Sequence, residues 1–304
     1  MEIAIINKYQ NKVNRGAETF VSELSKRLSK NHQVDILTKI NFFKKYDIVI
    51  PTNGRLQVFI VRILTWLTGS KMIVSGQSGV GLDDRLNLYA MPNVFVAISS
   101  YALDKSKKIN PFVKSLYIPN GVDLDKFKLQ GPTLQLRLEK PVILCVSALV
   151  DWKRLDLIIK AVSKLKKGSL LLVGKGDQEN NLQKLGDKLL PNRFKILSFE
   201  HKDMPKVYKS ADLFTFSTVP WESFGIVLVE AMASGLPVVA TDDPIRREIV
   251  GDAGLFIDPS DTDAYAKALE NALSINWGSK PRKQAEKFSW DKIALEYEKL
   301  FQKL

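Results

Sequence analysis

The chain has 304 residues with an ordinary share of apolar side chains, which is enough for two domains that each bury a core. One cysteine, Cys145, excludes a disulfide framework, and two histidines, His32 and His201, are too few and too far apart in sequence for a zinc site. The formal net charge of +12 is uneven, with +10 in residues 1–140 and +2 in residues 141–304. The basic first part therefore suits an acidic partner, such as anionic lipid, a lipid-linked phosphate or nucleic acid, unless the charge serves solubility alone.

The beginning of the sequence, MEIAII, lacks the basic segment and the cleavage site of a secretory signal. No apolar run reaches the ~20 residues that span a bilayer. We therefore expect a cytoplasmic protein that is at most peripheral at the inner face of a membrane.

Strands and helices alternate over the first part of the chain. The pattern predicts strands at 2–7, 34–38, 47–51, 71–75 and 94–98, and helices at 14–30, 55–67 and from Ser99 to Lys108. A strand, a glycine turn at Gly16, a helix and a second strand make a βαβ unit at the start.

Two segments of this part invite a functional interpretation. The apolar helix at 55–67 is either a core helix or a membrane-surface helix that exposes Phe59, Ile63 and Trp66. The glycine-rich loop after the strand at 71–75 carries Asp83 and Asp84, which either take a polar role in a site or hold Arg85.

The second part repeats the alternation after an irregular linker at 129–139. It predicts strands at 141–147, 169–173, 194–197, 212–217 and 236–240, and helices from about 154, at 204–211, 226–233, 261–273 and 290–304. Cys145 lies within the first of these strands and is expected to be buried.

Lys153 and Arg154 stand where this first strand ends and the next helix begins. Cations are unfavourable at a helix start unless they hold an anion. A diphosphate would explain both residues, and the alternative is solvent-exposed charge.

The stretch from Val219 to Thr241 combines features of a ligand site. The helix at 226–233 is apolar on every side except at Glu230, so this carboxylate is expected to be buried and paired. Glu222 lies in the preceding loop with Ser223 and Gly225, where free backbone N–H groups and the helix dipole favour an anion. Two carboxylates with an anion-binding helix start suggest a nucleotide-sugar site. The alternative is that Glu222 is solvated and Glu230 meets a buried Lys or Arg.

The string E-S-F-G-x4-E-A-M-A-S-G-L-P-V-V-A-T, which runs from Glu222 to Thr241, resembles the E-x7-E signature of the GT-B retaining glycosyltransferases of family 4. I-P-N-G-V-D-x3-F, from Ile118 to Phe127, resembles a second string of this family. The resemblance implies an α/β protein of the GT-B fold, in which two doubly wound Rossmann-like domains face a central cleft. We expect an N-terminal acceptor-side domain at 1–135, a nucleotide-sugar-binding domain at 136–288, and a C-terminal helix at 289–304 that packs back towards the first domain.

The resemblance also implies roles for single residues. Glu222 would hold the hydroxyls of the transferred sugar and Glu230 the ribose hydroxyls, while Lys153 and Arg154 would offset the charge of the leaving diphosphate. The residues implied on the nucleotide-sugar side are Ser223, Phe224, Gly225, Gly174, Gly176, Phe199 and Gly16, and those on the acceptor side are Gln77, Asp83 and Asp84.

The chain departs from the family pattern at two points. Gln77 stands where the family often has a histidine. Ser147 and Ala148 stand where it usually has Gly-Arg, so that Arg154 is left to replace a phosphate-binding arginine.

The function implied is transfer of a sugar, with retention, from a nucleotide-diphospho-sugar to a saccharide or lipid-linked saccharide acceptor. It needs no metal and no cofactor besides the donor, and it involves no nucleic acid. An anionic membrane surface is a further candidate partner. Two alternatives stay open, namely an inactive partner subunit and a nucleotide-sugar hydrolase or epimerase on the same fold.

Overall fold

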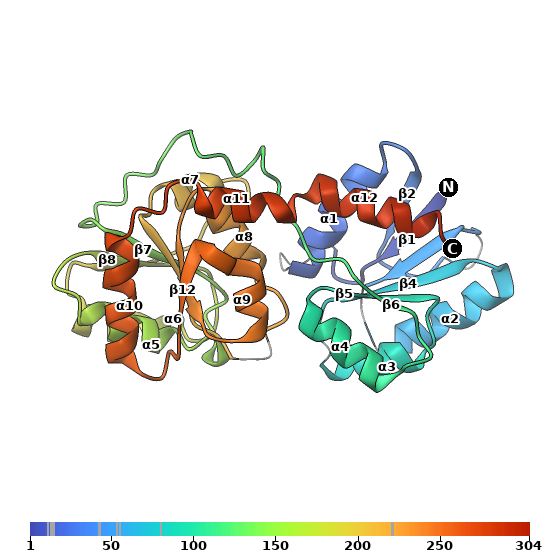
Figure 1. Ribbon diagram of the computed structural model, residues 1–304, viewed down its shortest axis with the longest axis horizontal. Helices are drawn as coiled ribbons and strands as arrows, with labels where there is room; N and C mark the ends of the chain where they lie inside the picture. Colours follow the sequence, from blue (N-terminus) through green and yellow to red (C-terminus); the bar gives the residue numbers. More distant parts are fainter. Residues whose placement is uncertain are drawn as a thin grey trace. The chain divides into compact units, whose positions relative to one another are not determined.

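The computed structural model describes residues 1–10, 12, 16–41, 44–52, 54, 56–79, 81–219 and 222–304. The chain forms two compact units (Figure 1). Met1–Gly121, residues 222–225 and Phe288–Leu304 form unit 1, and residues 122–219 with Ile226–Lys287 form unit 2. The division thus falls earlier than residue 135. The reason is that Phe127 packs against Tyr208, and Leu129 lies beside Gly235, both in unit 2.

Unit 1 is a parallel α/β unit. Its elements are β1 Glu2–Ile6, α1 Gly16–Leu28, β2 Gln33–Leu37, β3 Ile48–Pro51, α2 Leu56–Thr68, β4 Lys71–Gly76, α3 Leu82–Tyr89, β5 Val94–Ala97, α4 Ser100–Ile109, β6 Ser115–Tyr117 and α12 Trp290–Phe301. The strand order is β2-β1-β3-β4-β5-β6, so the chain reverses its direction of winding between β1 and β3. In open parallel sheets, ligands bind outside the carboxyl ends of the strands at such a switch point. The glycine-rich segment after β4, expected as a loop, contains the helix α3.

Unit 2 repeats this plan. Its elements are β7 Val142–Val146, the 3₁₀ turn η1 Asp151–Lys153, α5 Leu155–Ser163, β8 Ser169–Val173, α6 Glu179–Leu189, β9 Phe194–Leu197, α7 Met204–Lys209, β10 Leu213–Phe216, α8 Ile226–Ala233, β11 Val238–Thr241, α9 Pro244–Val250, η2 Gly251–Ala253, β12 Gly254–Ile257, α10 Thr262–Ser274 and α11 Lys280–Ala285; η3 Glu286–Phe288 leads to α12. The strand order is β12-β11-β10-β7-β8-β9, which puts the switch point between β7 and β10. The sequence pattern did not indicate α6, α9, β12 or α11.

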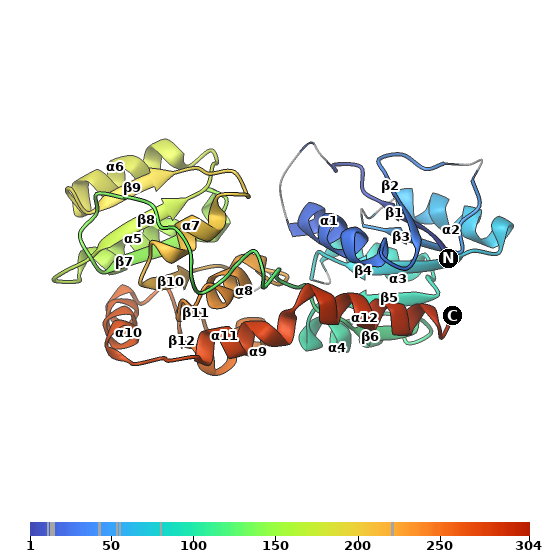
Figure 2. The same ribbon diagram turned by 90° about the horizontal axis from the view of Figure 1, so that it is seen from above.

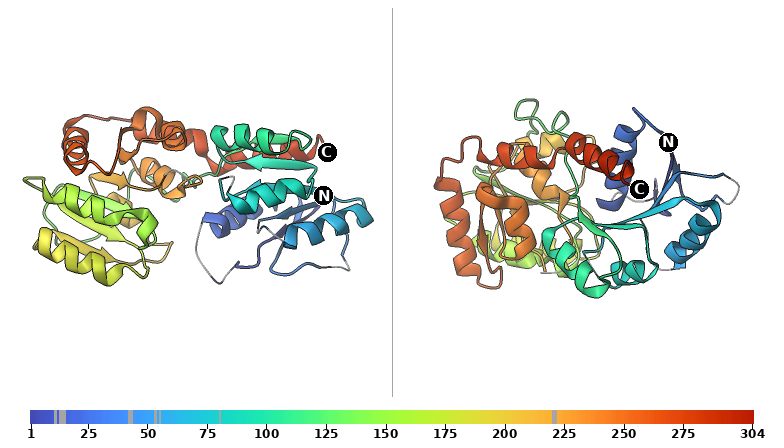
Figure 3. Two further views of the ribbon diagram at one scale, coloured as in Figure 1. Left: turned by 90° about the horizontal axis from the view of Figure 1, so that it is seen from below. Right: turned by 45° about the vertical axis from the view of Figure 1, so that its right-hand side comes forward.

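Both faces of each sheet are covered, as continuous apolar strands require. In unit 1, α1 and α12 cover one face of the sheet, and α2, α3 and α4 cover the other (Figure 1 and Figure 2). In β1, Ile3 and Ile5 belong to the core on the first face, whereas Ala4 and Ile6 belong to the core on the second. In unit 2, α5, α6 and α10 share one core with β7 and β8 (Figure 3). Cys145 is buried in β7, as expected, and its burial raises the pKa of the thiol to about 12.

Helix α2 is buried on one side and exposed on the other. Val58, Val61 and Thr65 are buried and belong to the side that faces the unit. The opposite side exposes apolar side chains, with exposed fractions of 37% for Phe59, 57% for Ile63 and 67% for Trp66. None of the helices in the described part of the chain has the length and the hydropathy to cross a bilayer.

Helix α12 completes the core of unit 1 although it is separated in sequence from the rest of it. Trp290 and Tyr297 are buried and lie against Phe20 of α1, with ring centroids 6.1 and 6.0 Å away. The Trp290 ring also packs directly on Gly121. A Cβ atom added at Gly121 would lie only 2.7 Å from this ring, so the position has no room for a side chain. The last helix therefore forms part of the core of this unit.

We predict that Trp290→Ala lowers the stability of the protein by about 3–5 kcal/mol, because it leaves a cavity between α12 and α1. The measurement is thermal and urea unfolding followed by circular dichroism. Leu295→Ala is the matched control, because Leu295 is on the same helix but 54% exposed. Equal unfolding midpoints for the two variants would contradict the packing role of α12.

Candidate functional site

The switch point of unit 2 brings the loops after β7 and β10 together. Ser217, directly after β10, donates its hydroxyl to the backbone carbonyls of Lys153 and Arg154 at 2.9 and 3.0 Å. The Lys153 ammonium lies 5.3 Å from the ring centroid of Phe216, the last residue of β10. The structure therefore holds both predicted cations at the edge of the sheet where ligands bind in this architecture.

Arg154 has an unusual backbone conformation for a residue with a side chain. Its φ of 52° and ψ of 39° lie in the left-handed region, and it stands at the N-terminal cap of α5 without a capping side chain. This conformation is disfavoured for residues other than glycine and asparagine. It is the kind of local strain that a functional loop carries, and it turns the chain from η1 into α5.

Glu230 is buried, as expected, and two partners satisfy its carboxylate. Tyr208 of α7 donates its hydroxyl to Oε2 at 2.7 Å, and Nε2 of His201 lies 3.2 Å from Oε1. Within the described part of the chain the side-chain partners of Glu230 are thus a histidine and a tyrosine, and the alternative of a buried Lys or Arg is not seen there. Burial and the nearby charge of Glu230 raise the pKa of Tyr208 well above 10, so that the hydroxyl stays protonated and can donate. Sequence reasoning did not identify Tyr208, whose only signal was a tyrosine in an otherwise ordinary short helix.

The segment before α8 contains residues predicted to contact the donor. Gly225 has a φ of 86°, which only glycine adopts without strain. Phe224 is buried against Phe288, with ring centroids 5.8 Å apart, so it is a packing residue. Glu222 and Ser223 are half-buried. Within unit 1, Ser223 also lies against Gly79 of the loop after β4, where an added Cβ would come within 3.0 Å of the Ser223 Cα.

Close contact between two backbone segments explains why glycine stands at positions 174 and 176. An added Cβ at Gly174 would lie 1.8 Å from the Ser147 carbonyl oxygen, and one at Gly176 would lie 2.2 Å from that of Leu149. The N–H of Leu149 donates to the Lys175 carbonyl at 3.0 Å. The two glycines thus hold the loop after β8 against the loop that leads to Lys153. Phe199 follows β9, the outer strand on this side, and is half-buried.

The predicted acceptor-side residues lie together in unit 1, but most of their polar atoms bond within the protein. Gln77 exchanges two hydrogen bonds with the buried Asn120, at 2.9 and 3.2 Å, and also donates to Ser75. Asp84 is buried and accepts from the Ser78 N–H at 3.1 Å, which fixes the loop after β4. Asp83 is half-buried beside Gly54.

Gly16 begins α1 and is exposed, while the residues just before it lie outside the described part of the chain. Nearby, at the carboxyl end of β1, the buried Asn7 donates to the buried carboxylate of Glu18 at 3.3 Å. Sequence reasoning missed this buried polar pair.

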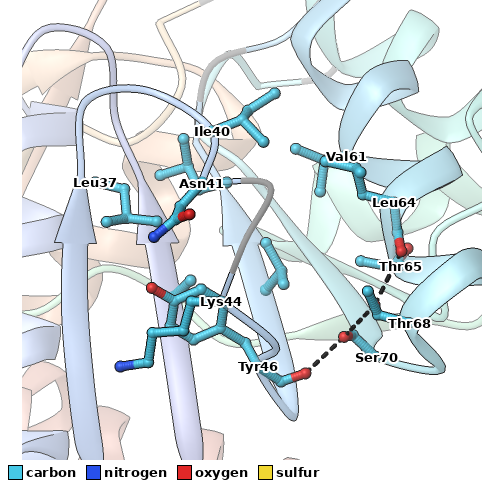
Figure 4. A pocket seen from close by; sticks show the side chains of 13 residues that line it. Leu37, Ile40, Asn41, Lys44, Tyr46, Val61, Leu64, Thr65, Thr68 and Ser70 are labelled. Carbon is cyan, nitrogen blue, oxygen red and sulfur yellow. Dashed lines mark hydrogen bonds between the residues drawn. The ribbon is translucent and has the colours of Figure 1, made fainter.

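Two further features bear on ligands. Among the residues that the structure describes, no three His, Cys, Asp or Glu side chains gather closely enough to hold a metal ion. In unit 1, a cavity of about 40 Å³ lies between α2 and the segment after β2, with Val61 and Leu64 facing Leu37 and Ile40 (Figure 4). This volume holds a water molecule or two but no sugar.

Comparison with known proteins agrees with this architecture. The Glycosyl transferases group 1 family matches residues 129–289. An uncharacterized glycosyltransferase of Methanocaldococcus jannaschii is 28% identical over 250 residues, which are 72% of this chain and 64% of that protein. A phosphatidyl-myo-inositol mannosyltransferase of Mycolicibacterium smegmatis is 29% identical over 206 residues, 61% of this chain and 51% of that protein. The chain thus spans about half to two thirds of the length of these relatives.

The fold also has close solved counterparts. Alr3699/HepE from Anabaena, crystallised with UDP and glucose, superposes with a TM-score of 0.84 over 100% of both chains at 19% identity. Sucrose-phosphate synthase from Thermosynechococcus elongatus superposes with a TM-score of 0.79 at 18% identity, over 99% of this chain and 98% of that one. The predicted GT-B fold is confirmed, and the chain belongs to the glycosyl transferases group 1 family.

Proposed function

We propose that the protein is a retaining glycosyltransferase of family 4 that uses a nucleotide-diphospho-sugar donor and no metal. The acceptor is a saccharide or lipid-linked saccharide in cell-surface glycan synthesis. The observation that carries the proposal is the arrangement in unit 2, where a cationic loop lies at the switch point and a fixed, buried carboxylate lies on the helix that follows β10. Such a pair suits the two polar parts of a nucleoside diphosphate.

In this proposal Lys153 and Arg154 bind the diphosphate, and the N–H groups at the start of α8 add donors. Glu230 accepts hydrogen bonds from the ribose hydroxyls, and Glu222 from the hydroxyls of the transferred sugar. The cations stabilise charge that grows on the leaving phosphate, so they act on the transition state more than on the bound donor.

The chemical step exchanges one bond at the anomeric carbon for another. The bond from this carbon to the phosphate oxygen breaks, and the acceptor hydroxyl oxygen bonds to the carbon on the same face. The hydroxyl proton passes to the leaving phosphate oxygen. No side chain then needs to act as nucleophile.

The surface of unit 1 supports an anionic, membrane-bound acceptor. A groove of about 520 Å³ lies near the carboxyl ends of β1 and β2 and is lined by Lys8, Lys12 and Lys39 together with Leu56 and Ile60. Leu56 also begins the exposed apolar side of α2. The predicted acceptor-side residues Gln77, Asp83 and Asp84 do not line this groove. A lipid-linked anion fits its lysines, and matched relatives include transferases for phosphatidylinositol and lipopolysaccharide.

A turnover assay separates transferase activity from its rivals. Release of nucleoside diphosphate that depends on a saccharide or lipid acceptor supports the transferase. Equal release with and without acceptor indicates a hydrolase. If nucleotide sugars bind without any release, an isomerised nucleotide sugar indicates an epimerase, and an unchanged one indicates a binding subunit.

We predict that replacing Lys153 and Arg154 together with Ala lowers turnover by about 10²–10³-fold, as for loss of other groups that stabilise transition-state charge. The matched control is Lys166→Ala with Lys167→Ala, which removes the same charge from exposed positions beyond the far end of α5. Thermal melting of both variants checks the fold. If the two double variants turn over equally, the cationic loop has no catalytic part.

We also predict weak, reversible and salt-sensitive binding to anionic vesicles. Each basic residue near an anionic leaflet contributes about 1 kcal/mol, and salt screens this attraction. Co-sedimentation is measured at low and high salt with vesicles of phosphatidylglycerol and phosphatidylcholine or of phosphatidylcholine alone.

The exposed apolar residues of α2 are the ones to replace in this experiment. Trp66→Ser with Leu67→Ser should reduce binding, whereas Leu295→Ser, which changes an exposed apolar residue on α12, should not. Equal binding to neutral and anionic vesicles would contradict the electrostatic contribution, and no binding to either would make the acceptor soluble.

A further inference from the structure

We propose that Lys126, His201 and Tyr208 are positioning residues that orient the carboxylate of Glu230 towards the ribose of the donor. This inference rests on the proposed function, in which Glu230 binds the ribose hydroxyls. The four side chains form a continuous polar chain in unit 2, although they come from the segment before the linker, the loop after β9, α7 and α8. Nothing in the sequence pattern connects them.

The first link fixes the proton on the histidine. The ammonium Nζ of Lys126 lies 2.7 Å from Nδ1 of His201. An ammonium can only donate, so Nδ1 must accept and the ring proton must be on Nε2. Nε2 lies 3.2 Å from Oε1 of Glu230 and therefore donates to the carboxylate. Lys126 thus determines which tautomer His201 presents to Glu230.

The second link holds the other carboxylate oxygen. Tyr208 is fully buried and donates to Oε2 at 2.7 Å. Among the described residues, each carboxylate oxygen then has one side-chain donor, and each keeps a second lone-pair direction. Two remaining acceptor positions on one fixed carboxylate match the two neighbouring hydroxyls of a ribose.

The surroundings hold this chain in place. The ring of Phe127 lies 6.1 Å from His201 and 5.7 Å from Tyr208, centroid to centroid. Arg282 donates to the backbone carbonyl of Phe127 at 2.6 Å, and Asp123 accepts from the backbone N–H of Lys126 at 2.9 Å. Within this series of hydrogen-bonded side chains, His201 is half-exposed, whereas the exposed fraction of the Glu230 side chain is only 7%. The carboxylate is therefore set before any ligand arrives, which is the condition for strong, oriented binding.

The test compares ribonucleotides with analogues that lack the two hydroxyls. Dissociation constants are measured by calorimetry for UDP and GDP and for their 2′,3′-dideoxy forms. The parent protein should prefer the ribose form of the nucleotide that it binds by about 10- to 100-fold, as expected for hydrogen bonds to a charged group. Glu230→Gln should abolish most of this preference.

The positioning variants should lower the same ratio. Tyr208→Phe and His201→Phe should each reduce the ribose preference by at least about threefold, while the affinity for the dideoxy form stays unchanged and shows that the site is folded. His201→Gln keeps an N–H donor that can reach Glu230, so it should retain more of the preference than His201→Phe. A role limited to stability would lower the melting temperature without changing the ratio.

Lys126 is tested through the histidine ring itself. The ¹⁵N chemical shifts of the His201 imidazole should indicate the Nε2–H tautomer in the parent and in Lys128→Met, which removes a nearby exposed lysine. Lys126→Met should lose this single tautomer and lower the ribose preference.

The outcomes separate this inference from the proposed function. If Glu230→Gln abolishes the preference but Tyr208→Phe and His201→Phe keep it, Glu230 binds the ribose without help and the inference is overturned. If Glu230→Gln itself keeps the preference, the assignment of the ribose to Glu230 is wrong, and the inference falls with it.

Discussion

A carboxylate inside a protein must receive hydrogen bonds, because its water shell is lost and cannot be replaced by apolar contacts. Glu230 imposes this requirement on unit 2. It lies on α8, whose other side chains are nearly all apolar, so its donors must come from other elements. The structure supplies them from the loop after β9 and from α7, through His201 and Tyr208. The same two residues contact the ring of Phe127, which lies in the first segment of unit 2, after Gly121.

The second constraint is the close approach of backbone to backbone at the switch point. The loops after β7 and β8 touch so closely that side chains at Gly174 and Gly176 would collide with the carbonyls of Ser147 and Leu149. This contact and the hydroxyl of Ser217 support the loop that carries Lys153 and Arg154. The glycines therefore act on the cationic loop indirectly, as parts of its scaffold, and a phosphate-binding role for them is not required to explain their presence.

In unit 1, polar side chains predicted to bind the acceptor also form hydrogen bonds within the protein. Gln77 and Asp84 bond within the loop after β4 and with Asn120, so their polar atoms shape the loop. Three lysines, Lys8, Lys12 and Lys39, instead line the groove near β1 and β2, together with Leu56 and Ile60 of α2. This combination of lysines and apolar surface is the observation on which we propose an anionic, lipid-linked acceptor for this unit.

Most of the alternation of strands and helices, the burial of Cys145 and Glu230, and the family could be predicted from the sequence, because periodicity and a long specific motif are local properties of the chain. Helices α3, α6, α9 and α11 and strand β12 could not. The sequence also indicated Phe59, Ile63 and Trp66 as the side chains that a surface helix would expose, although it could not tell that α2 is buried on its other side. Tertiary structure alone decided that Tyr208, His201 and Lys126 meet at Glu230, since these contacts join residues between 22 and 75 positions apart. It also decided that Gly174 and Gly176 serve packing and that Gln77 pairs with Asn120. Partners of this kind are chosen by the register and winding of the sheets, which no local pattern in the chain records.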